Sequence, residues 1–325
     1  MLTETDVFIR TGALDTGATK VVGSGDERPC LLAVNRKRRR GKQLTLETSS
    51  VTSKALVAPL SVPYFERRRL HERRRLHESG DGVTYFSVSQ RGRRRESLED
   101  VCFADKASCY YSIFDGHGGS RAAQFASRKL HEKIVLDRKS MREAFLETDR
   151  EFAKCEEFNG HHSSSCGTTA VSVRISGKKL TVAHVGDSRA LLVTPTRVET
   201  LTTDHSATAA SEAERIQRAG GYVLNKRVSG SLAISRAIGD IRYKQFIVAE
   251  PDIVTLEVDE ENSFLVLGTD GLWGVVSDAE IHRELLEAKG DLRLACRNLV
   301  DLTFKCDGRD DASVVAVNLD AAGEL

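Results

Sequence analysis

In one stretch an apolar run of strand character meets an aspartate in a glycine-rich turn. Its residues are Tyr110-Tyr111-Ser112-Ile113-Phe114-Asp115-Gly116-His117-Gly118-Gly119. Related arrangements recur at 263–271 with Asp270, at 180–187 with Asp187 and, with the acid before the strand, at 310–317 with Asp310. Aspartates at the ends of neighbouring buried strands can converge on one spot, where their carboxylates repel each other and need a cation. The pattern therefore indicates a metal centre rather than ordinary turns.

The composition is that of an ordinary globular protein, with 325 residues and 40% hydrophobic side chains. No apolar run approaches the ~20 residues of a membrane helix, and the first residues lack the pattern of a secretory signal. We therefore expect no membrane association, and we expect a monomer. The seven cysteines are odd in number and include no Cys-x-x-Cys pair, which favours reduced thiols and a location in nucleus and cytoplasm.

The formal net charge is only +1, but arginine runs crowd the first third of the chain, at 36–40, 67–69, 73–75 and 93–95. Residues 1–80 show no sustained helical or strand period, and we predict a basic, largely disordered extension there. A repeat within it, 66–71 and 72–77, is either a short basic helix or a solvated low-complexity stretch. Residues 81–320 are predicted to form one folded catalytic domain.

Periodicity predicts both strands and helices in the folded part. Strands are expected at 83–88, 168–175, 180–185, 190–193 and 314–319, and helices at 120–136, 141–155, 207–219, 277–288 and 292–304. Ser120 is the expected N-cap of the first helix, and Gly220-Gly221 is the expected stop of the third. Antiparallel-looking strand groups with helix pairs between them favour an α+β fold.

Six carboxylates are the candidate metal ligands, and no cluster of Cys or His with zinc spacing accompanies them. They are Glu99, Asp100, Asp115, Asp187, Asp270 and Asp310. An all-oxygen set favours hard cations, so we expect two Mg²⁺ or Mn²⁺ ions. Two such ions can activate a water as nucleophile, so that no side-chain nucleophile is required.

Three further residues near Asp115 have candidate roles. Gly116 can bring its carbonyl to an ion because it has no side chain, and His117 is placed to act as general acid for a leaving oxygen. Arg95, five residues before Asp100, could hold a phosphate by a bidentate pair, or it could be only one member of the basic run 93–95.

Taken together and in order, these motifs resemble the metal-dependent Ser/Thr protein phosphatases of type 2C, with some features of plant members. The matching stretches are 95–100, 114–119, 165–170, 185–189, 230–240, 269–273 and 310–314. The resemblance spans residues 83–319 and implies a β-sandwich of two antiparallel sheets flanked by α-helices, with the metals at one end. It implies an enzyme that hydrolyses phosphoserine and phosphothreonine in phosphoprotein substrates.

Carried over by position, the resemblance implies a role for each site residue. Asp115 would bridge both ions and Gly116 would give its carbonyl. Asp270 and Asp310 would complete one metal, while Glu99 and Asp100 would lie near the other, partly through water. Arg95 would bind the substrate phosphate, His117 would be the acid, and Asp187 would belong to a weaker third metal site.

Two departures from the family pattern change these expectations. Gly274 stands where the family usually has an aspartate that helps Asp187 hold the third ion, so we expect a doubtful third site, with weaker metal dependence or slower turnover. It also motivates a rival hypothesis, a catalytically weak scaffold that binds a kinase. The loop 222–227 lacks the tryptophan of hormone-receptor-binding plant members, so we do not expect that partnership.

A basic segment of the extension resembles a docking motif for mitogen-activated protein kinases. Its basic cluster could pair with an acidic patch, and two leucines two residues apart could enter adjacent apolar pockets. The alternatives are a nuclear localisation signal, which is compatible with docking, and plain solvated charge. Specific nucleic-acid binding is a weaker hypothesis because no aromatic stacking pattern accompanies the arginines. The docking residues are Lys37, Arg38, Arg39, Arg40, Leu44 and Leu46.

Overall fold

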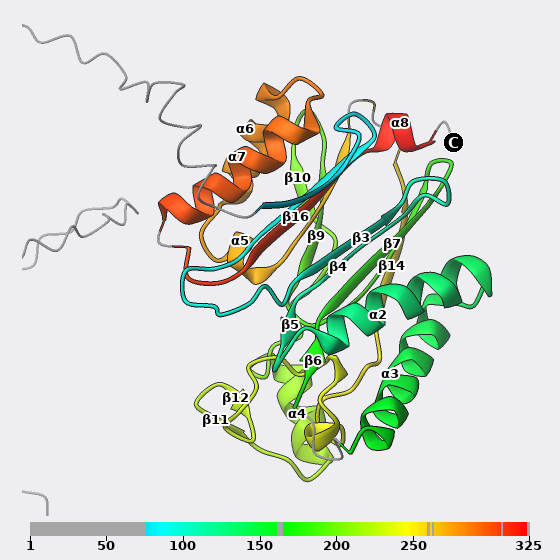
Figure 1. Cartoon of the computed structure of the whole chain (residues 1–325), viewed down its shortest axis with the longest axis vertical. Helices are drawn as coiled ribbons and strands as arrows, with labels where there is room; N and C mark the ends of the chain where they lie inside the picture. The colour runs from blue at the N-terminus through cyan, green and yellow to red at the C-terminus, as the bar shows by residue number, and fades with distance from the viewer. Residues whose placement is uncertain (1–75, 161–164, 259–260, 262, 307, 324–325) are drawn as a thin grey trace, which may run out of the picture. The chain divides into compact units, whose positions relative to one another are not determined.

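A computed structural model of the chain describes residues 76–160, 165–258, 261, 263–306 and 308–323. Within these residues two large antiparallel sheets pack face to face, and helices cover the outer face of each sheet (Figure 1). The predicted α+β sandwich is confirmed. The first strand, β1 (Leu76–Gly80), lies inside the range 1–80 that we assigned to the extension, so the sheet begins earlier than residue 83. The predicted disorder and the short basic helix concern residues 1–75, which lie outside the described residues.

Both large sheets are antiparallel throughout. The six-stranded sheet has the order β1, β2 (Tyr85–Gln90), β16 (Ala312–Asn318), β15 (Phe264–Gly268), β9 (Arg189–Val193), β10 (Val198–Thr200). The five-stranded sheet has the order β14 (Asp252–Glu257), β8 (Lys179–Val185), β7 (Ala170–Ser176), β4 (Tyr110–Phe114), β3 (Val101–Asp105).

Strand β4 shows how the sequence builds the layers. All five of its residues are buried, and successive side chains point to opposite faces. Tyr111 and Ile113 join the core between the two sheets, whereas Tyr110 and Phe114 pack against helices. A strand buried on both faces reads as a continuous apolar run, which is why 110–114 has no alternation of polar and apolar residues.

Two groups of helices cover the sheets. The five-stranded sheet packs against α2 (Arg121–His131), which continues as a π-helical turn (Glu132–Leu136), and against α3 (Met141–Phe158). The six-stranded sheet packs against α5 (Asp270–Trp273), α6 (Asp278–Glu287) and α7 (Leu292–Lys305). The last helix is α8 (Leu319–Gly323). No helix in the described part is long and apolar enough to cross a membrane.

Two helix starts differ in their capping chemistry. Ser277 forms a capping box with Glu280 at the start of α6. Ser120 stands at the predicted N-cap of α2, but its hydroxyl accepts from the Gln124 side chain at 3.1 Å instead of capping the backbone.

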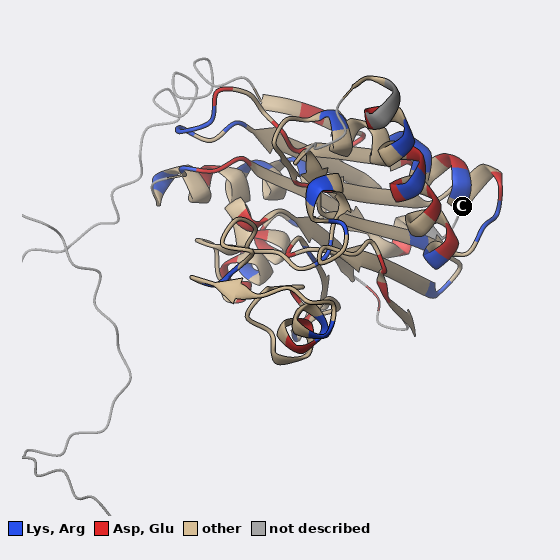
Figure 2. Cartoon of the chain, turned by 90° about the horizontal axis from the view of Figure 1, so that it is seen from below, with Lys and Arg blue, Asp and Glu red and all other residues tan. Residues whose placement is uncertain are grey.

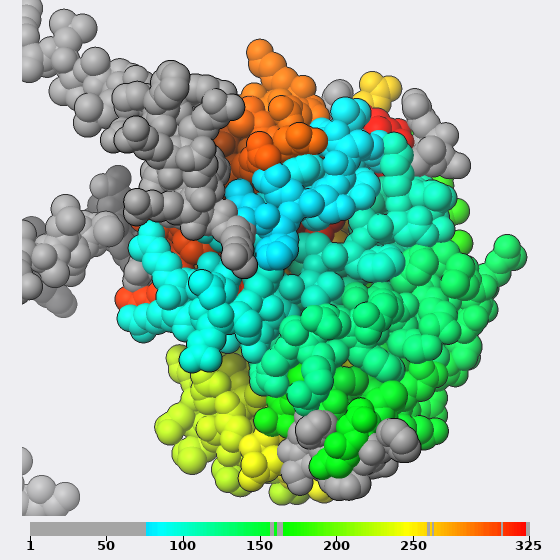
Figure 3. Space-filling model, in the orientation of Figure 1, coloured from blue at the N-terminus to red at the C-terminus, as the bar shows by residue number. Residues whose placement is uncertain are grey.

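In the space-filling view the N-terminal strands lie beside the C-terminal helices (Figure 3), and acids and bases are interspersed over the helices (Figure 2).

One end of the sandwich carries smaller elements. A three-stranded sheet has the order β13 (Ile238–Gly239), β6 (Gly167–Thr168), β5 (Gly116–His117). Beside it, residues 207–247, which we call the 207–247 segment, hold α4 (Ala210–Arg218), the hairpin β11 (Val223–Leu224) and β12 (Arg227–Val228), and a 3-10 turn (Ile241–Tyr243) (Figure 1). This segment has its own apolar cluster, which includes Ile216, Val228 and Ile247.

Candidate metal centre

Strand pairing brings the predicted acids to one end of the sandwich. The pairing of Val101 with Phe114 sets Asp100 opposite Asp115 across β3 and β4. In the other sheet, the pairing of Gly268 with Val314 sets the turn after β15, with Asp270, beside the residues that precede β16, with Asp310. We call Asp100, Asp115, Asp270 and Asp310 the acid cluster. It joins the ends of both sheets.

The four carboxylates of the acid cluster act on one another. Burial raises the pKa of Asp115 well above its ordinary value, and repulsion from Asp100, Asp270 and Asp310 raises it further. Burial and repulsion from Asp310 also raise the pKa of Asp270, against a hydrogen bond with Asp115. Carboxylates that resist ionisation together are the electrostatic signature of a site for a cation.

Asp100 supplies the test of fit for a metal. Its Oδ2 accepts from Ser313 Oγ at 2.7 Å and from Thr269 Oγ1 at 3.0 Å. Its Oδ1 is buried and has no hydrogen-bond partner among the described residues. Burial, the first cause, and repulsion from Asp311 raise the pKa of Asp100 to about 7. A buried oxygen without a partner is costly, and a hard cation would satisfy it.

In both Asp-Gly turns the glycine lies against the backbone carbonyl of another acidic residue. A Cβ on Gly116 would lie 2.6 Å from the Glu99 carbonyl oxygen, and a Cβ on Gly271 would overlap the carbonyl of Asp311. Any side chain at these two positions would push the acid-bearing segments apart. The glycines therefore make the convergence of the cluster possible, which is a use distinct from the hairpin turns that Asp-Gly commonly makes.

Arg95 reaches the acid cluster from the loop before β3. Its Nε donates to Asp310 Oδ1 at 2.7 Å, and its Nη1 lies 3.9 Å from Glu99 Oε2. Arg93 turns elsewhere, because its Nη2 donates to the Phe304 carbonyl at 2.9 Å. Arg95 and Arg93 therefore make different contacts, and the phosphate-binding role of Arg95 stays a prediction.

Asp311 holds a loop in place, a structural role that the sequence analysis did not predict. Its two oxygens accept from the backbone N–H groups of Gly92 at 2.8 Å and Glu99 at 2.9 Å. These two bonds hold the loop that carries Arg95 against the start of β16. The doubled aspartate at 310–311 was the available signal, since one acid can face the cluster while its neighbour holds the loop.

Asp187 lies near the cluster, after the end of β8. Burial raises its pKa to about 6, together with repulsion from Asp270 and Asp204. Asp204 is itself held by Arg189 through two bonds of 2.8 and 2.7 Å. Gly274 is exposed at the end of α5 and adds no carboxylate here, and a Cβ on it would meet only the Asp270 carbonyl oxygen, at 3.0 Å.

His117 lies on the small sheet and contacts an acid from a distant part of the chain. Its Nε2 lies 3.0 and 2.9 Å from the two carboxylate oxygens of Asp240. The Asp240 side chain is fully buried, whereas that of His117 is 24% exposed. Asp240 was not among the predicted site residues, because a separation of 123 positions in the sequence gives no local pattern.

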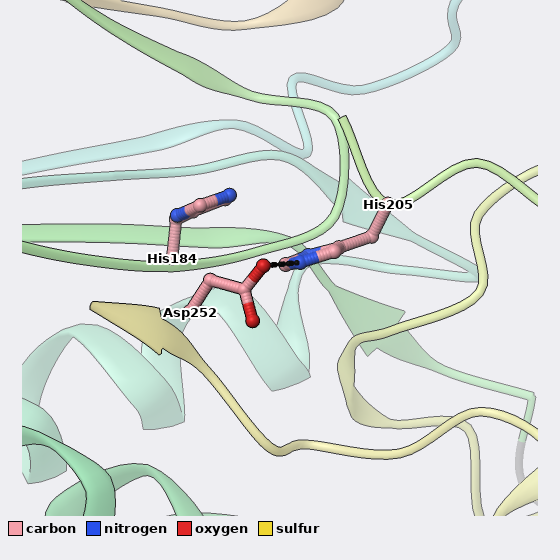
Figure 4. Close-up of side chains that lie close together, drawn as sticks. All are labelled: His184, His205 and Asp252. Carbon is pink, nitrogen blue, oxygen red and sulfur yellow. Dashed lines mark hydrogen bonds and ion pairs between the residues drawn. The ribbon is translucent and has the colours of Figure 1, made fainter. Parts of the chain in front are cut away.

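A second group of possible metal ligands lies apart from the acid cluster, made of His184, His205 and Asp252 (Figure 4). The two rings are stacked, with centroids 4.7 Å apart and planes 8° from parallel. Because each imidazole lone pair lies in its ring plane, the two rings aim at different points. His184 Nε2 also contacts the Thr203 carbonyl at 2.9 Å, and His205 Nε2 contacts Asp252 at 3.1 Å. As arranged, His184 of β8 and Asp252 of β14 hold the loop that carries Thr203 and His205. One ring would have to turn before both could reach one ion.

Comparison with known proteins agrees with this geometry. The family model described as protein phosphatase 2C matches residues 84–311. Probable protein phosphatase 2C 32 of Oryza sativa subsp. japonica is 36% identical over 269 residues, covering 74% of this chain and 67% of the relative. Probable protein phosphatase 2C 2 of Arabidopsis thaliana is 35% identical over 309 residues, covering 87% and 77%.

Solved structures agree on the fold. A serine-threonine phosphatase 2C from Toxoplasma gondii superposes with a TM-score of 0.62 at 22% identity, covering 75% of this chain and 98% of that one. A sex determining protein of C. elegans gives a TM-score of 0.64 at 23% identity, covering 75% and 67%. The family match and the curated relatives carry the assignment further than the fold alone. The chain therefore belongs to the protein phosphatase 2C family, and it is a metal-dependent serine/threonine protein phosphatase.

Proposed function

We propose that this phosphatase hydrolyses phosphoserine and phosphothreonine with two Mg²⁺ or Mn²⁺ ions held by the acid cluster. The observation that carries the proposal is the buried Asp100 Oδ1, which has no partner among the described residues and belongs to a group of mutually repelling carboxylates. A cation removes both penalties at once. The all-oxygen donor set favours these two hard ions over zinc.

Each residue then has a defined task. Asp115, Asp270 and Asp310, with Asp100, Glu99 and the Gly116 carbonyl, would hold the ions, and Asp187 would serve a weaker third site. When bound, the ions would supply an activated water and neutralise charge on the phosphate. Arg95, whose side chain is 38% exposed, would orient the phosphate through its guanidinium by exchanging Asp310 for a phosphate oxygen. His117 would donate a proton to the departing serine or threonine oxygen.

The reaction class is tested by phosphate release from matched peptides. We expect release from phosphothreonine and phosphoserine peptides with Mn²⁺ or Mg²⁺, none in EDTA, and far less from the phosphotyrosine peptide of the same sequence. Release that is equal in EDTA and in Mn²⁺ would remove the metal-dependent mechanism.

We further propose that the basic extension directs the enzyme to a mitogen-activated protein kinase in nucleus and cytoplasm. The residues concerned, 37–46, lie outside the described residues, so the support is the sequence: a basic cluster followed by Leu44 and Leu46. Pull-down of the kinase by wild type and by Leu44→Ala/Leu46→Ala separates docking from nuclear targeting, since only docking needs the leucines. A kinase that binds the double variant equally well would remove the docking proposal.

The alternative, a catalytically weak scaffold, is favoured by one observation, the missing carboxylate at Gly274. A Cβ there would lie 3.0 Å from the Asp270 carbonyl oxygen, so a side chain fits only if that backbone moves by a few tenths of an ångström. If wild type releases no phosphate while Gly274→Asp does, the scaffold becomes the better account. Comparable rates for the two proteins would mean that the third site is dispensable.

A further inference from the structure

We propose that Asp240 is the positioning residue of the general acid: its buried carboxylate fixes the ring of His117 so that Nδ1 faces the leaving oxygen. This inference rests on the proposed role of His117. It assigns a task to an acid that does not belong to the acid cluster and that lies on a different element from every proposed metal ligand.

The contact itself defines the orientation of the ring. Both Asp240 oxygens lie within hydrogen-bond distance of the same nitrogen, His117 Nε2, at 3.0 and 2.9 Å. An ionised carboxylate accepts only, so Nε2 carries the hydrogen of this pair. The nitrogen left for a substrate is Nδ1, and to act as the acid it must carry a second hydrogen, which it gives to the leaving oxygen while the Nε2 hydrogen stays with Asp240.

Asp240 is held rigidly for this purpose. Its backbone adopts the left-handed conformation, with φ 53°, which is uncommon outside glycine and is retained where the surroundings enforce it. Its backbone N–H donates to the Cys166 carbonyl at 2.9 Å. The preceding residue, Gly239, donates its N–H to Asp149 Oδ1 at 2.8 Å.

The central strand of the small sheet, β6, leaves room for the side chains of His117 and Asp240. A Cβ on Gly167 would lie 2.6 Å from His117 Nε2 and would overlap the carboxylate of Asp240. Gly167 therefore leaves the space in which the two side chains meet. Since β5, β6 and β13 pair in register through Gly116–Thr168 and Ile238–Thr168, the backbone brings His117 and Asp240 together before any substrate is present.

The leaving group gives a test that a purely structural role would not pass. The oxygen of threonine is a poor leaving group that needs a proton, whereas p-nitrophenolate leaves without one. We expect Asp240→Asn and Asp240→Ala to lower kcat for a phosphothreonine peptide by about tenfold or more, and to change kcat for p-nitrophenyl phosphate by about twofold or less. Both assays are run at saturating Mn²⁺.

The matched control is Asp149→Asn, which perturbs the same 239–244 stretch but does not contact His117, because Asp149 binds the Gly239 N–H and Lys244. We expect it to treat the two substrates alike. In a His117→Ala background, Asp240→Asn should have no further effect, since the two residues act as a unit. Histidine-selective ¹⁵N NMR of the wild type, which needs no variant to fold, should show His117 protonated at Nε2.

The outcomes distinguish this inference from the proposed function. Equal losses on both substrates, a full additional loss in the His117→Ala background, or an Nε2 without a proton would each overturn the positioning role while leaving a metal-dependent phosphatase. Absence of metal-dependent release by folded wild type would overturn the proposed function, and this inference with it.

Discussion

Asp100 is the residue whose energetics depend most on a cation. Its pKa in the fold is about 7, against 3.8 for an unperturbed aspartate, so the metal-free folded protein binds more protons than the unfolded chain between these values. Stability is therefore highest near the lower value and is lost as pH rises towards 7. Because Asp100 and its neighbouring carboxylates repel one another, this cost belongs to the acid cluster as a whole. Asp187, with a pKa of about 6, acts in the same direction.

We predict that, in EDTA, the acid cluster lowers the free energy of unfolding between pH 5 and pH 7.5, and that saturating Mn²⁺ reverses this loss because it binds the folded state. The buried His184 and His205, whose pKa values are lowered by burial, act in the opposite direction, so the contribution of the cluster is read from the difference between wild type and Asp100→Asn. Asp100→Asn should flatten the pH dependence in EDTA, while the exposed-acid control Asp278→Asn should not. Urea denaturation at a series of pH values measures this. An Asp100→Asn variant with the same pH dependence in EDTA as wild type would contradict the electrostatic account of the cluster.

A second prediction concerns Asp311, whose side chain accepts hydrogen bonds from the backbone. Asp311→Ala leaves the N–H groups of Gly92 and Glu99 without their acceptor, at about 1–3 kcal/mol for each buried group. We expect lower stability by urea denaturation and a higher KM, because the loop that carries Arg95 loosens. Asp311→Asn keeps one acceptor oxygen and should lose less on both counts. Unchanged stability in the alanine variant would mean that the loop is held by other contacts.

Among single residues, the members of the acid cluster could be predicted from the sequence, but the residues that hold the surrounding segments in place could not. Asp115, Asp270 and Asp310 could be predicted because each stands beside an apolar run, which fixes its place at a strand end. Asp240, Asp311 and the stacked pair His184 and His205 could not, because their partners are brought together by strand pairing over long separations. Their catalytic and ligand roles remain predictions for the variants described above.

At the scale of elements, an ionic network connects the 207–247 segment to the sandwich. Arg236 donates to Glu212 Oε1 at 2.6 Å and to Asp252 Oδ1 at 2.7 Å, at the start of β14. Asp252 contacts His205, whose Nδ1 accepts from the Gly186 N–H at 3.1 Å, next to Asp187. Although burial would raise it, hydrogen bonds from Arg236, Ser235 and Arg215 lower the pKa of Glu212 to about 2. The network is therefore charged at neutral pH.

We predict that Arg236→Met loosens this segment without unfolding the sandwich. Removing Arg236 leaves Arg215, at 2.9 Å, as the cation beside Glu212, so the cost is below the about 3–5 kcal/mol of a buried charge left unpaired, and it falls mainly on the segment. Limited proteolysis should cut within 207–247 sooner, and KM for the phosphopeptide should rise more than KM for p-nitrophenyl phosphate. The control is Arg218→Met, which breaks an exposed pair with Glu214 on the same helix. Equal protease resistance in both variants would contradict the anchoring role.

The elements predicted best were the long ones with a clear period. The predicted helix at 292–304 is α7 (Leu292–Lys305), and the predicted strand at 180–185 is β8 (Lys179–Val185). The prediction at 207–219 was too long at its start, because α4 begins at Ala210. Strands β3 and β14 were not predicted, since β3 is only half-buried and β14 is a largely exposed edge strand, so that neither has a strong apolar signal.

At the scale of the whole molecule, the described residues form the two-sheet sandwich, and most of the family match at 84–311 lies among them. Antiparallel-looking groups of strands, with helix pairs between them, predicted the α+β layering. The two-sheet sandwich with the acids at one end was implied by the family resemblance of the ordered motifs. Residues 1–75 contribute no described element.

We predict that deletion of residues 1–75 leaves metal-dependent kcat within about twofold of the full chain, since every proposed catalytic residue lies after β1. Kinase pull-down, if the docking proposal holds, should be lost in the same deletion. The full chain with Leu44→Ala/Leu46→Ala is the matched control, which should lose binding while it keeps the basic run. A deletion that folds but loses activity towards p-nitrophenyl phosphate would place part of the catalytic unit in the extension.

The most direct test of the account is phosphate release from a phosphothreonine peptide as a function of Mn²⁺ concentration, for wild type and for Asp115→Ala in parallel. We predict a rate that rises with Mn²⁺ to saturation in wild type, and a rate at least about 100-fold lower at every concentration in the variant, with both proteins folded by circular dichroism. A folded Asp115→Ala that responds to Mn²⁺ as wild type does would contradict the assignment of the acid cluster as the metal centre.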